Sequence, residues 1–486
     1  MPARLQSANM ENLENRLSLQ YFGLAVITLL AAVLRFYNLG EWSFWIDEIF
    51  ELTRSLAALN QVNGTTTLSH LSIGAALAVF DVNEWSARLA PALIGVISIP
   101  ILYFPFRKLL GVVPALLASL LLAISPWHLY WSQNVRFYTL LMLLYTLALF
   151  VFFFGIEKNR SWYVAAAMLL LGIAARERLT ALFFVPVAMS YLALVRFLPF
   201  PKPPGLNRRN LVILLLPLLL YGLYDLAGFV RVVFFSPATE AEVVRNSSNV
   251  GDIFTLFVGQ SNHSPFRLLS SICYRLTLPV CVLALCGGAC LIMARSRTGL
   301  FLVLGALVPV ILLTLISPFM FTVDRYVFVT LPCWALLAVT AVQQLSAQVK
   351  KSGKIFVAGV LLMLVMDSLG NSLLYFQYQN GNRTDWKSAF ALVRQRKQPD
   401  DLVVCSRPEV GRYYLQEKIE YLDNFNHAAL NGSGRRVWFV VDRDLTPAEK
   451  WIQKSSRLVE VLDVNMTGKT LKLRVYLYSP NDALRS

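Results

Sequence analysis

Long apolar runs recur along most of this chain. A membrane-spanning helix needs about 20 mainly apolar residues, and this criterion predicts about eleven spans before residue 376. Of all residues, 56% are hydrophobic and 15% are charged, which excludes an ordinary soluble enzyme, a disordered chain and a disulfide-rich secreted module. The predicted spans are 19–38, 87–107, 110–131, 137–156, 162–175, 181–198, 211–230, 270–293, 299–319, 326–345 and 355–375.

The basic excess of the chain predicts its orientation in the membrane. Lys and Arg number 44 and Asp and Glu number 29, for a net charge of +15. We attribute this excess to short loops facing anionic lipid, so membrane lipids are expected partners and nucleic acid is not. The positive-inside rule then places these loops and the N-terminus in the cytoplasm, and the alternate loops and the C-terminal region outside an inner membrane. The loop residues are Arg107, Lys108, Lys158, Arg160, Lys202, Arg208, Arg209, Arg295, Arg297, Lys350, Lys351 and Lys354.

Charged residues gather at the helix ends on the predicted outer side. Charges at membrane depth are costly and are usually functional, so we expect one polar cavity opening outward. The alternative is that each is an interfacial residue reaching toward lipid headgroups. Asp225 would line the same cavity from the outer half of its span, and His128 is either an interfacial side chain or a substrate contact. The clustered residues are Asp47, Glu48, Arg136, Arg176, Glu177, Arg178, Asp324 and Arg325.

The composition changes near residue 376. Apolar runs become shorter and charged residues more frequent, which predicts a membrane domain over 1–375 and a small extracytoplasmic α/β domain over 376–486. Within the second domain, helices are predicted at 384–396, with Asp385 near the start, and at 447–455. Strands are predicted at 402–405, 437–441, 458–464 and 471–477.

The first outer loop carries the sequence Trp45-Ile46-Asp47-Glu48. Apolar residues from Ile49 to Leu59 recur at helical spacing, which predicts an amphipathic interfacial helix with Glu51 on its polar side. Asp47 is then either an N-cap for that helix, with Glu48 suiting the helix dipole, or a carboxylate held at the membrane surface as a general base.

This loop and later motifs resemble the GT-C glycosyltransferases. The branch is that of protein O-mannosyltransferases, the lipid A aminoarabinose transferase and related bacterial transferases of lipopolysaccharide sugars. The resemblance covers the first seven predicted spans well and the rest loosely. Its motifs are Trp45-Ile46-Asp47-Glu48, Asn83-Glu84-Trp85-Ser86-Ala87-Arg88-Leu89-Ala90-Pro91, Ile124-Ser125-Pro126-Trp127-His128 with Ser132-Gln133-Asn134-Val135-Arg136-Phe137-Tyr138, and Asp324-Arg325-Tyr326 with Pro332.

The resemblance implies inverting transfer of one sugar from a polyprenyl-phosphate carrier to an extracytoplasmic acceptor. A surface polysaccharide, a lipopolysaccharide or a lipid-linked glycan is favoured over protein. Asp47 would be the general base, assisted by Glu48, and fixed arginines would bind the donor phosphate because the guanidinium fork matches its oxygens. The arginine candidates are Arg88, Arg136, Arg176, Arg178 and Arg325, and the candidates lining the substrate cavity are His128, Tyr138, Glu177, Asp225 and Asp324.

Some features leave alternatives open. Asp47 and Glu48 could hold a divalent metal ion, but two carboxylates alone are a poor ligand set. Relatives often carry an acid before the Arg-x-Tyr motif, where this chain has Asn134 and Val135, and a His-Pro-Pro stretch where it reads Thr65 to His70. The rival functions are a transporter or lipid flippase, and a non-catalytic assembly protein that binds the carrier lipid. Transporters usually show paired repeats, which this sequence lacks.

Overall fold

The computed structural model describes residues 2–235, 264–348, 353–426, 434–466 and 469–480. The chain divides into two compact units. Unit 1 comprises residues 1–31, 95–128 and 138–368, and unit 2 comprises 32–94, 129–137 and 369–486. Most of the predicted loop 231–269 lies outside the described residues.

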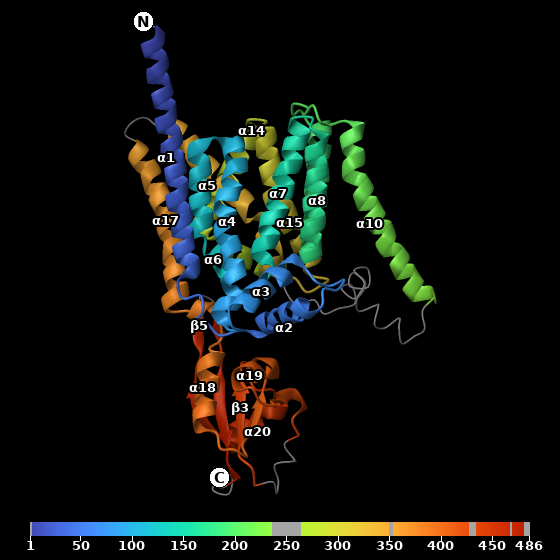
Figure 1. Ribbon diagram of the computed structural model, residues 1–486, viewed down its shortest axis with the longest axis vertical. Coiled ribbons are helices and arrows are strands. Elements are labelled where there is room, and N and C mark those ends of the chain that lie inside the picture. Colours follow the sequence, from blue (N-terminus) through green and yellow to red (C-terminus); the bar gives the residue numbers. More distant parts are fainter. Residues whose placement is uncertain (1, 236–263, 349–352, 427–433, 467–468, 481–486) are drawn as a thin grey trace. The chain divides into compact units, whose positions relative to one another are not determined.

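Unit 1 is a bundle of helices. Within it α7 packs on α8 (Figure 1). Helix α14 packs on α16. Four helices contribute residues to both units: α1 (Pro2–Phe36), α4 (Glu84–Leu110), α6 (Pro126–Ser132) and α17 (Lys354–Gln377). The others in unit 1 are α5 (Val112–Ile124), α7 (Tyr138–Glu157), α8 (Ser161–Glu177), α9 (Phe184–Phe197), α10 (Arg208–Phe235), α13 (Pro265–Leu276), α14 (Leu278–Met293), α15 (Arg297–Ile316) and α16 (Leu331–Gln348), with the 3-10 helices η1 (Leu179–Phe183) and η2 (Asp324–Thr330).

All eleven predicted spans are helical, but two of them are not continuous. Among the described residues, seven helices are long and apolar enough to cross a membrane, and two bent helix pairs bring the total to as many as nine. The predicted span over 110–131 is bent, because α5 and α6 meet at 57° where Pro126 interrupts the backbone hydrogen bonds. The span over 270–293 likewise breaks at Thr277, whose φ is 71°, and α13 and α14 meet at 96°.

The predicted α/β region belongs to unit 2. Its five-stranded sheet has the order β2-β1-β3-β7-β4, in which β1 pairs parallel with β2 and β3, while β7 pairs antiparallel with β3 and β4. The strands are β1 (Leu402–Cys405), β2 (Glu420–Tyr421), β3 (Val437–Val441), β4 (Arg457–Val461) and β7 (Arg474–Tyr478), and β5 (Val464–Met466) pairs with β6 (Lys469–Leu471) as a separate ribbon. The predictions for β1 and β3 are confirmed to the residue.

Helices α18 (Trp386–Arg396), α19 (Pro408–Leu415) and α20 (Lys450–Ser455) flank this sheet (Figure 1). Asp385 caps α18 as predicted, since its carboxylate accepts from the Ser388 backbone N–H at 3.2 Å. Helix α19 was not predicted, and the helix predicted over 447–455 is the short η7 (Pro447–Glu449) followed by α20.

Unit 2 also contains the first loop of the chain, which folds as α2 (Ile46–Asn60) and α3 (Leu68–Val79). One apolar core joins these two helices to the sheet region. It includes Phe44, Ile49 and Leu52 from the first loop and Trp386 and Phe390 from α18. The start of α2 is therefore fixed by side chains that lie more than 300 residues later in the sequence.

Candidate functional site

Asp47 and Glu48 lie in the first turn of α2. The N-cap of this helix is Trp45, whose backbone is extended at φ −107° and ψ 170°, so the interpretation of Asp47 as the N-cap is wrong. The Trp45 backbone N–H faces a Glu48 carboxylate oxygen at 3.4 Å. This capping contact turns Glu48 inward and leaves Asp47 on a different side of the turn.

Glu48 forms a fully buried ion pair with Arg88 of α4. Arg88 Nε donates to Glu48 Oε1 at 3.0 Å and Arg88 Nη2 donates to Glu48 Oε2 at 2.9 Å, and both side chains are 0% exposed. The other three guanidinium N–H bonds are directed at the backbone carbonyls of Leu39, Trp42 and Ser43, at 3.2, 2.9 and 3.1 Å. All five N–H groups of Arg88 are thus used inside the protein.

A second arginine and a glutamine extend this cluster. Arg383, which is 2% exposed, has Nε 3.5 Å from Glu48 Oε2 and donates to the Gln133 backbone carbonyl at 2.5 Å. The Gln133 side chain accepts from Tyr375 Oη at 2.8 Å and donates to the Tyr37 carbonyl at 2.8 Å. We call Glu48, Arg88, Gln133, Tyr375 and Arg383 the Glu48 cluster. Arg383 was not predicted, because nothing near it in the sequence indicates an ion-pair partner.

The Glu48 carboxylate is held in its ionised form. Burial alone would raise its pKa, but the charges of Arg88 and Arg383 and the hydrogen bonds from Arg88 and the Val135 backbone N–H keep the pKa below its usual value. The Val135 N–H donates to Glu48 Oε1 at 2.9 Å. A buried carboxylate engaged in this way is a poor general base and has no oxygen directed at solvent.

Asp47 belongs to a separate polar network that reaches the surface. Its side chain is 26% exposed, and its Oδ2 lies 4.0 Å from Arg136 Nη2. Arg136 Nη1 donates to the Asp47 backbone carbonyl at 3.2 Å and to Glu51 Oε2 at 3.0 Å. The other Glu51 oxygen lies 3.1 Å from His70 Nε2. We call Asp47, Glu51, His70 and Arg136 the Asp47 network.

Two members of this network depart from the sequence-based expectation. Glu51 was expected on the solvent side of α2, yet it is 2% exposed because it fills the space between Arg136 and His70. His70 lies in the first turn of α3, and its Nδ1 accepts from the Thr67 backbone N–H at 3.1 Å. The spacing of Glu51 from Asp47 could have predicted that the two acids lie together, since residues four apart share one helix face.

The remaining arginine and acid candidates lie in unit 1. Arg176 and Arg178 are exposed at the end of α8, while Glu177 between them is buried. Asp324 of η2 accepts from Arg275 Nε at 2.9 Å and from Ser271 Oγ at 2.8 Å, and Arg325 beside it is half-buried. Within unit 1, η1 packs on η2, which brings the segments after Arg178 and Arg325 together. Arg275 was not among the predicted site residues.

Two other cavity candidates of unit 1, His128 and Tyr138, are buried. His128 is 0% exposed and its Nε2 lies 3.3 Å from Ser98 Oγ, so the alternative of a lipid-facing interfacial side chain is wrong. Tyr138 is 2% exposed at the first residue of α7. Asp225 lies in α10, and its side chain is outside the described residues.

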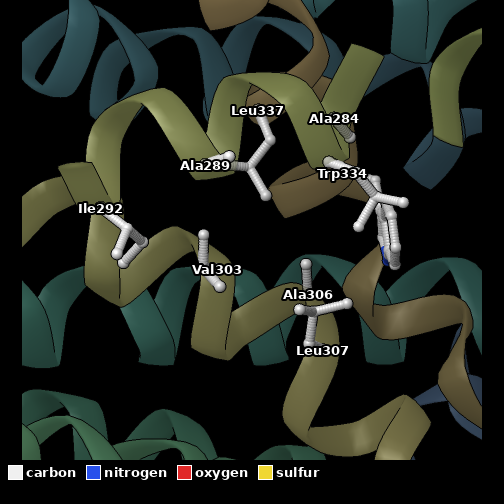
Figure 2. Close-up of a pocket in the computed structure, with 10 residues that line it drawn as sticks. Ala284, Ala289, Ile292, Val303, Ala306, Leu307, Trp334 and Leu337 are labelled. Carbon is white, nitrogen blue, oxygen red and sulfur yellow. The ribbon is translucent and has the colours of Figure 1, made fainter. Parts of the chain in front are cut away.

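Unit 1 also contains an apolar pocket of about 210 Å³ between α14, α15 and α16. Figure 2 shows Leu337 and Trp334 on one side and Val303 and Ala306 on the other. The polar atom of Trp334, Nε1, donates to Thr330 Oγ1 at 3.2 Å. The lining suits hydrocarbon and offers no polar side chain for a sugar.

The acid pair Asp47 and Glu48 does not fit a metal ion. Among the described residues, no three acidic, His or Cys side chains converge as ligands would. Both Glu48 oxygens already accept hydrogen bonds within the Glu48 cluster. Hard cations require several oxygen ligands, and Asp47 and Glu48 do not supply them.

Comparisons with known proteins agree with this fold. The family model described as dolichyl-phosphate-mannose-protein mannosyltransferase matches residues 68–224. A crystal structure of ArnT from Cupriavidus metallidurans bound to undecaprenyl phosphate matches with a TM-score of 0.61 at 15% identity, over 94% of this chain and 98% of that chain. No curated protein matches the chain in sequence.

Two structures of an archaeal enzyme also match. The oligosaccharyltransferase AglB from Archaeoglobus fulgidus, in complex with an inhibitory peptide and a dolichol-phosphate, gives a TM-score of 0.56 at 11% identity, over 93% of this chain and 74% of that chain. The same protein in complex with Zn and sulfate gives 0.54 at 12% identity, over 93% and 72%. The expected resemblance is confirmed: the chain is a multi-pass membrane protein with the GT-C fold.

Proposed function

We propose that this protein is an inverting membrane glycosyltransferase that moves one sugar from a polyprenyl-phosphate carrier to an extracytoplasmic glycan or glycolipid. Asp47 is its general base. The observation that carries the proposal is the contrast between two adjacent acids: Glu48 is sealed in a buried ion pair, while Asp47 is partly exposed and lies beside Arg136. A base and a phosphate-binding cation at one surface are what this transfer needs.

The reaction follows from these two side chains. Asp47 takes the proton of the acceptor hydroxyl as its oxygen attacks the anomeric carbon from the face opposite the phosphate. The bond between that carbon and the phosphate oxygen breaks, and the polyprenyl phosphate leaves with the electron pair. The transition state resembles an oxocarbenium ion, as in glycoside hydrolysis. The leaving phosphate needs no proton, but fixed cations stabilise its charge.

The identity of the carrier is inferred from the structural neighbours. ArnT binds undecaprenyl phosphate and AglB binds a dolichol-phosphate in their respective structures. We extend this ligand class to the present chain and assign the donor phosphate to Arg136, with Arg176, Arg178 and Arg325 as further candidates. We exclude Arg88 from the donor ligands, because its five N–H bonds are directed at Glu48 and at three backbone carbonyls. The reaction would take place outside the cytoplasmic membrane, with the N-terminus inside.

Replacing Arg136 tests its assignment to the phosphate. Arg136→Lys keeps the charge but loses the planar fork, so kcat/KM for the donor should fall about 10- to 100-fold, a few kcal/mol at most. The assay is initial-rate transfer at varied donor concentration in lipid vesicles. Arg412→Lys, on the exposed side of α19, is the matched control and should behave as wild type. A wild-type rate in Arg136→Lys would contradict the assignment.

Glu51 is proposed as a positioning residue that acts through Arg136. Glu51→Gln removes the charge that holds Arg136 Nη1 at 3.0 Å, so Arg136 should point less accurately at the donor. We expect the donor KM to rise more than kcat falls, by about tenfold. The nearby exposed Glu41→Gln serves as control. Equal losses in kcat and kcat/KM with an unchanged KM would instead indicate a direct role in chemistry.

The function as a whole is tested by a donor panel. Purified protein in vesicles is offered a series of polyprenyl-phosphate sugars with an envelope glycolipid extract, and release of polyprenyl phosphate is followed. Release that depends on both acceptor and Asp47 supports the proposal, and the active donor identifies the sugar. If the protein binds the carrier but releases it from no donor, the proposal fails in favour of a scaffold or transporter.

A further inference from the structure

A second pocket lies in unit 2, and its lining includes none of the side chains assigned to transfer. It has a volume of about 500 Å³, within the ~300–1,000 Å³ common for ligand sites. It opens between α18, α19 and the residues that begin α4. The lining residues that matter here are Glu84, Lys387, Phe390, Arg394, Tyr413 and Tyr414.

The aromatic part of this pocket suits the apolar face of a sugar ring. Tyr413 and Tyr414 are half-buried, and the Phe390 and Tyr414 rings are stacked with centroids 6.1 Å apart. Phe390 is 1% exposed and supports the Tyr414 ring, and the Tyr414 hydroxyl is engaged by Glu84 and the Phe44 backbone N–H. The flat faces of the two tyrosine rings are therefore the surface that a sugar ring would contact. A mixed aromatic and polar lining of this kind orients a ligand through a few hydrogen bonds.

The charge that this pocket presents to solvent is positive. Glu84 is 8% exposed and accepts from Tyr414 Oη at 3.0 Å, so its carboxylate is largely engaged. Lys387 and Arg394 are exposed; Lys387 Nζ lies 4.0 Å from Glu84 Oε1, and Arg394 donates to the Tyr414 backbone carbonyl. Two cations facing one buried acid favour a ligand with a carboxylate or phosphate.

The same tyrosines hold the segment that leads to Asp47. The Phe44 backbone N–H donates to Tyr414 Oη at 2.8 Å, and the Phe44 and Tyr413 rings meet edge to face at 5.0 Å. Phe44 immediately precedes Trp45, the N-cap of α2. A ligand bound in the pocket would therefore touch the residues that fix the start of the helix carrying Asp47.

We propose that this pocket is a binding site for an anionic glycan, a sugar chain bearing carboxylate or phosphate groups. We further assign this glycan as the acceptor of the transferred sugar, and that assignment rests on the proposed function. The binding site itself does not depend on the proposed function. The site is distinct in its side chains from both the Glu48 cluster and the Asp47 network.

Binding to the full chain in detergent micelles tests the proposal without any turnover. The probes are tetragalacturonate for carboxylate, mannose 6-phosphate for phosphate and maltotetraose as the neutral sugar, measured by titration calorimetry. At least one anionic probe should bind about tenfold or more tightly than maltotetraose, and the double variant Lys387→Gln/Arg394→Gln should remove that preference. Arg396→Gln, on the same helix and exposed, is the matched control.

The outcomes separate this site from the proposed function. Failure of both anionic probes to bind, equal binding of the neutral probe, or an equal loss in Arg396→Gln would overturn the site. The Asp47→Asn protein should bind the anionic probe as wild type does. If wild type binds the probe yet transfers sugar from no donor, the glycan site stands and the proposed function fails. If wild type transfers sugar but binds neither anionic probe, the proposed function stands and the glycan site fails.

Discussion

Asp47→Asn should abolish transfer while leaving the protein folded. The amide cannot take a proton from the acceptor hydroxyl, and a positioned general base contributes roughly 10²–10⁴-fold to the rate. Because the Asp47 side chain is 26% exposed and lies 4.0 Å from Arg136, its replacement should cost little stability. The measurement is the single-turnover rate of polyprenyl phosphate release, so that product release does not mask the chemical step.

A matched variant and a stability readout accompany that experiment. Asp81→Asn changes the same functional group at an exposed position of the same loop and should leave the rate unchanged. The thermal midpoint of Asp47→Asn should stay within a few degrees of wild type. A variant that transfers at the wild-type rate would show that another group is the base.

Arg88→Met should destabilise unit 2 more than any other single change named here. It leaves the Glu48 carboxylate, 0% exposed, without its bidentate partner, and breaking a buried ion pair from one side typically costs about 3–5 kcal/mol. It also leaves the carbonyls of Leu39, Trp42 and Ser43 without their donor. The thermal unfolding midpoint in detergent measures the loss, with exposed Arg412→Met as control.

The double variant Glu48→Gln/Arg88→Met identifies the cause. If the unpaired charge of Glu48 is responsible, removing that charge should recover part of the stability lost in Arg88→Met. No recovery would mean that the three backbone carbonyls, and not the charge, account for the loss. Either result supports a structural role for Arg88. A stable Arg88→Met protein with impaired donor binding would instead show that Arg88 is a donor ligand.

The pH dependence of stability follows from the lowered pKa of Glu48. A carboxylate with a depressed pKa in the folded state contributes stability above its unfolded pKa, about 4.3, and loses it as the pH falls through the folded value. Wild type should therefore lose stability progressively below about pH 4.3, and Glu48→Gln should lack that component of the slope. Identical acid unfolding curves for the two proteins would contradict the account of the cluster.

The membrane helices were predictable because each depends on its own composition. Eleven apolar segments were located from length and hydropathy alone, and the strands β1 and β3 from short apolar runs. The breaks at Pro126 and Thr277 were harder, because apolar residues continue across both and periodicity does not register a bend. A proline after an extended residue, as at Pro126, was the available signal.

The site was only partly predictable, because the role of each charged side chain depends on whether it is buried or exposed. Asp47 and Glu48 are adjacent in sequence and looked equivalent, yet one is sealed against Arg88 and the other faces Arg136. Arg383 lies far from Glu48 in sequence, and Glu51 was expected in solvent because it lies opposite the apolar face of its helix. Contacts between residues 40 positions apart, as for Glu48 and Arg88, to more than 300 apart, as for Glu48 and Arg383, decide these roles, and hydrophobic periodicity does not indicate them.

The central claim is that Asp47 acts in the chemical step and not in holding the donor or the fold. The most direct test measures donor binding and transfer on the same Asp47→Asn preparation in vesicles. We predict a donor Kd within a factor of about three of wild type, together with transfer reduced at least about 100-fold. Parallel losses of binding and transfer, or full transfer, would contradict the account.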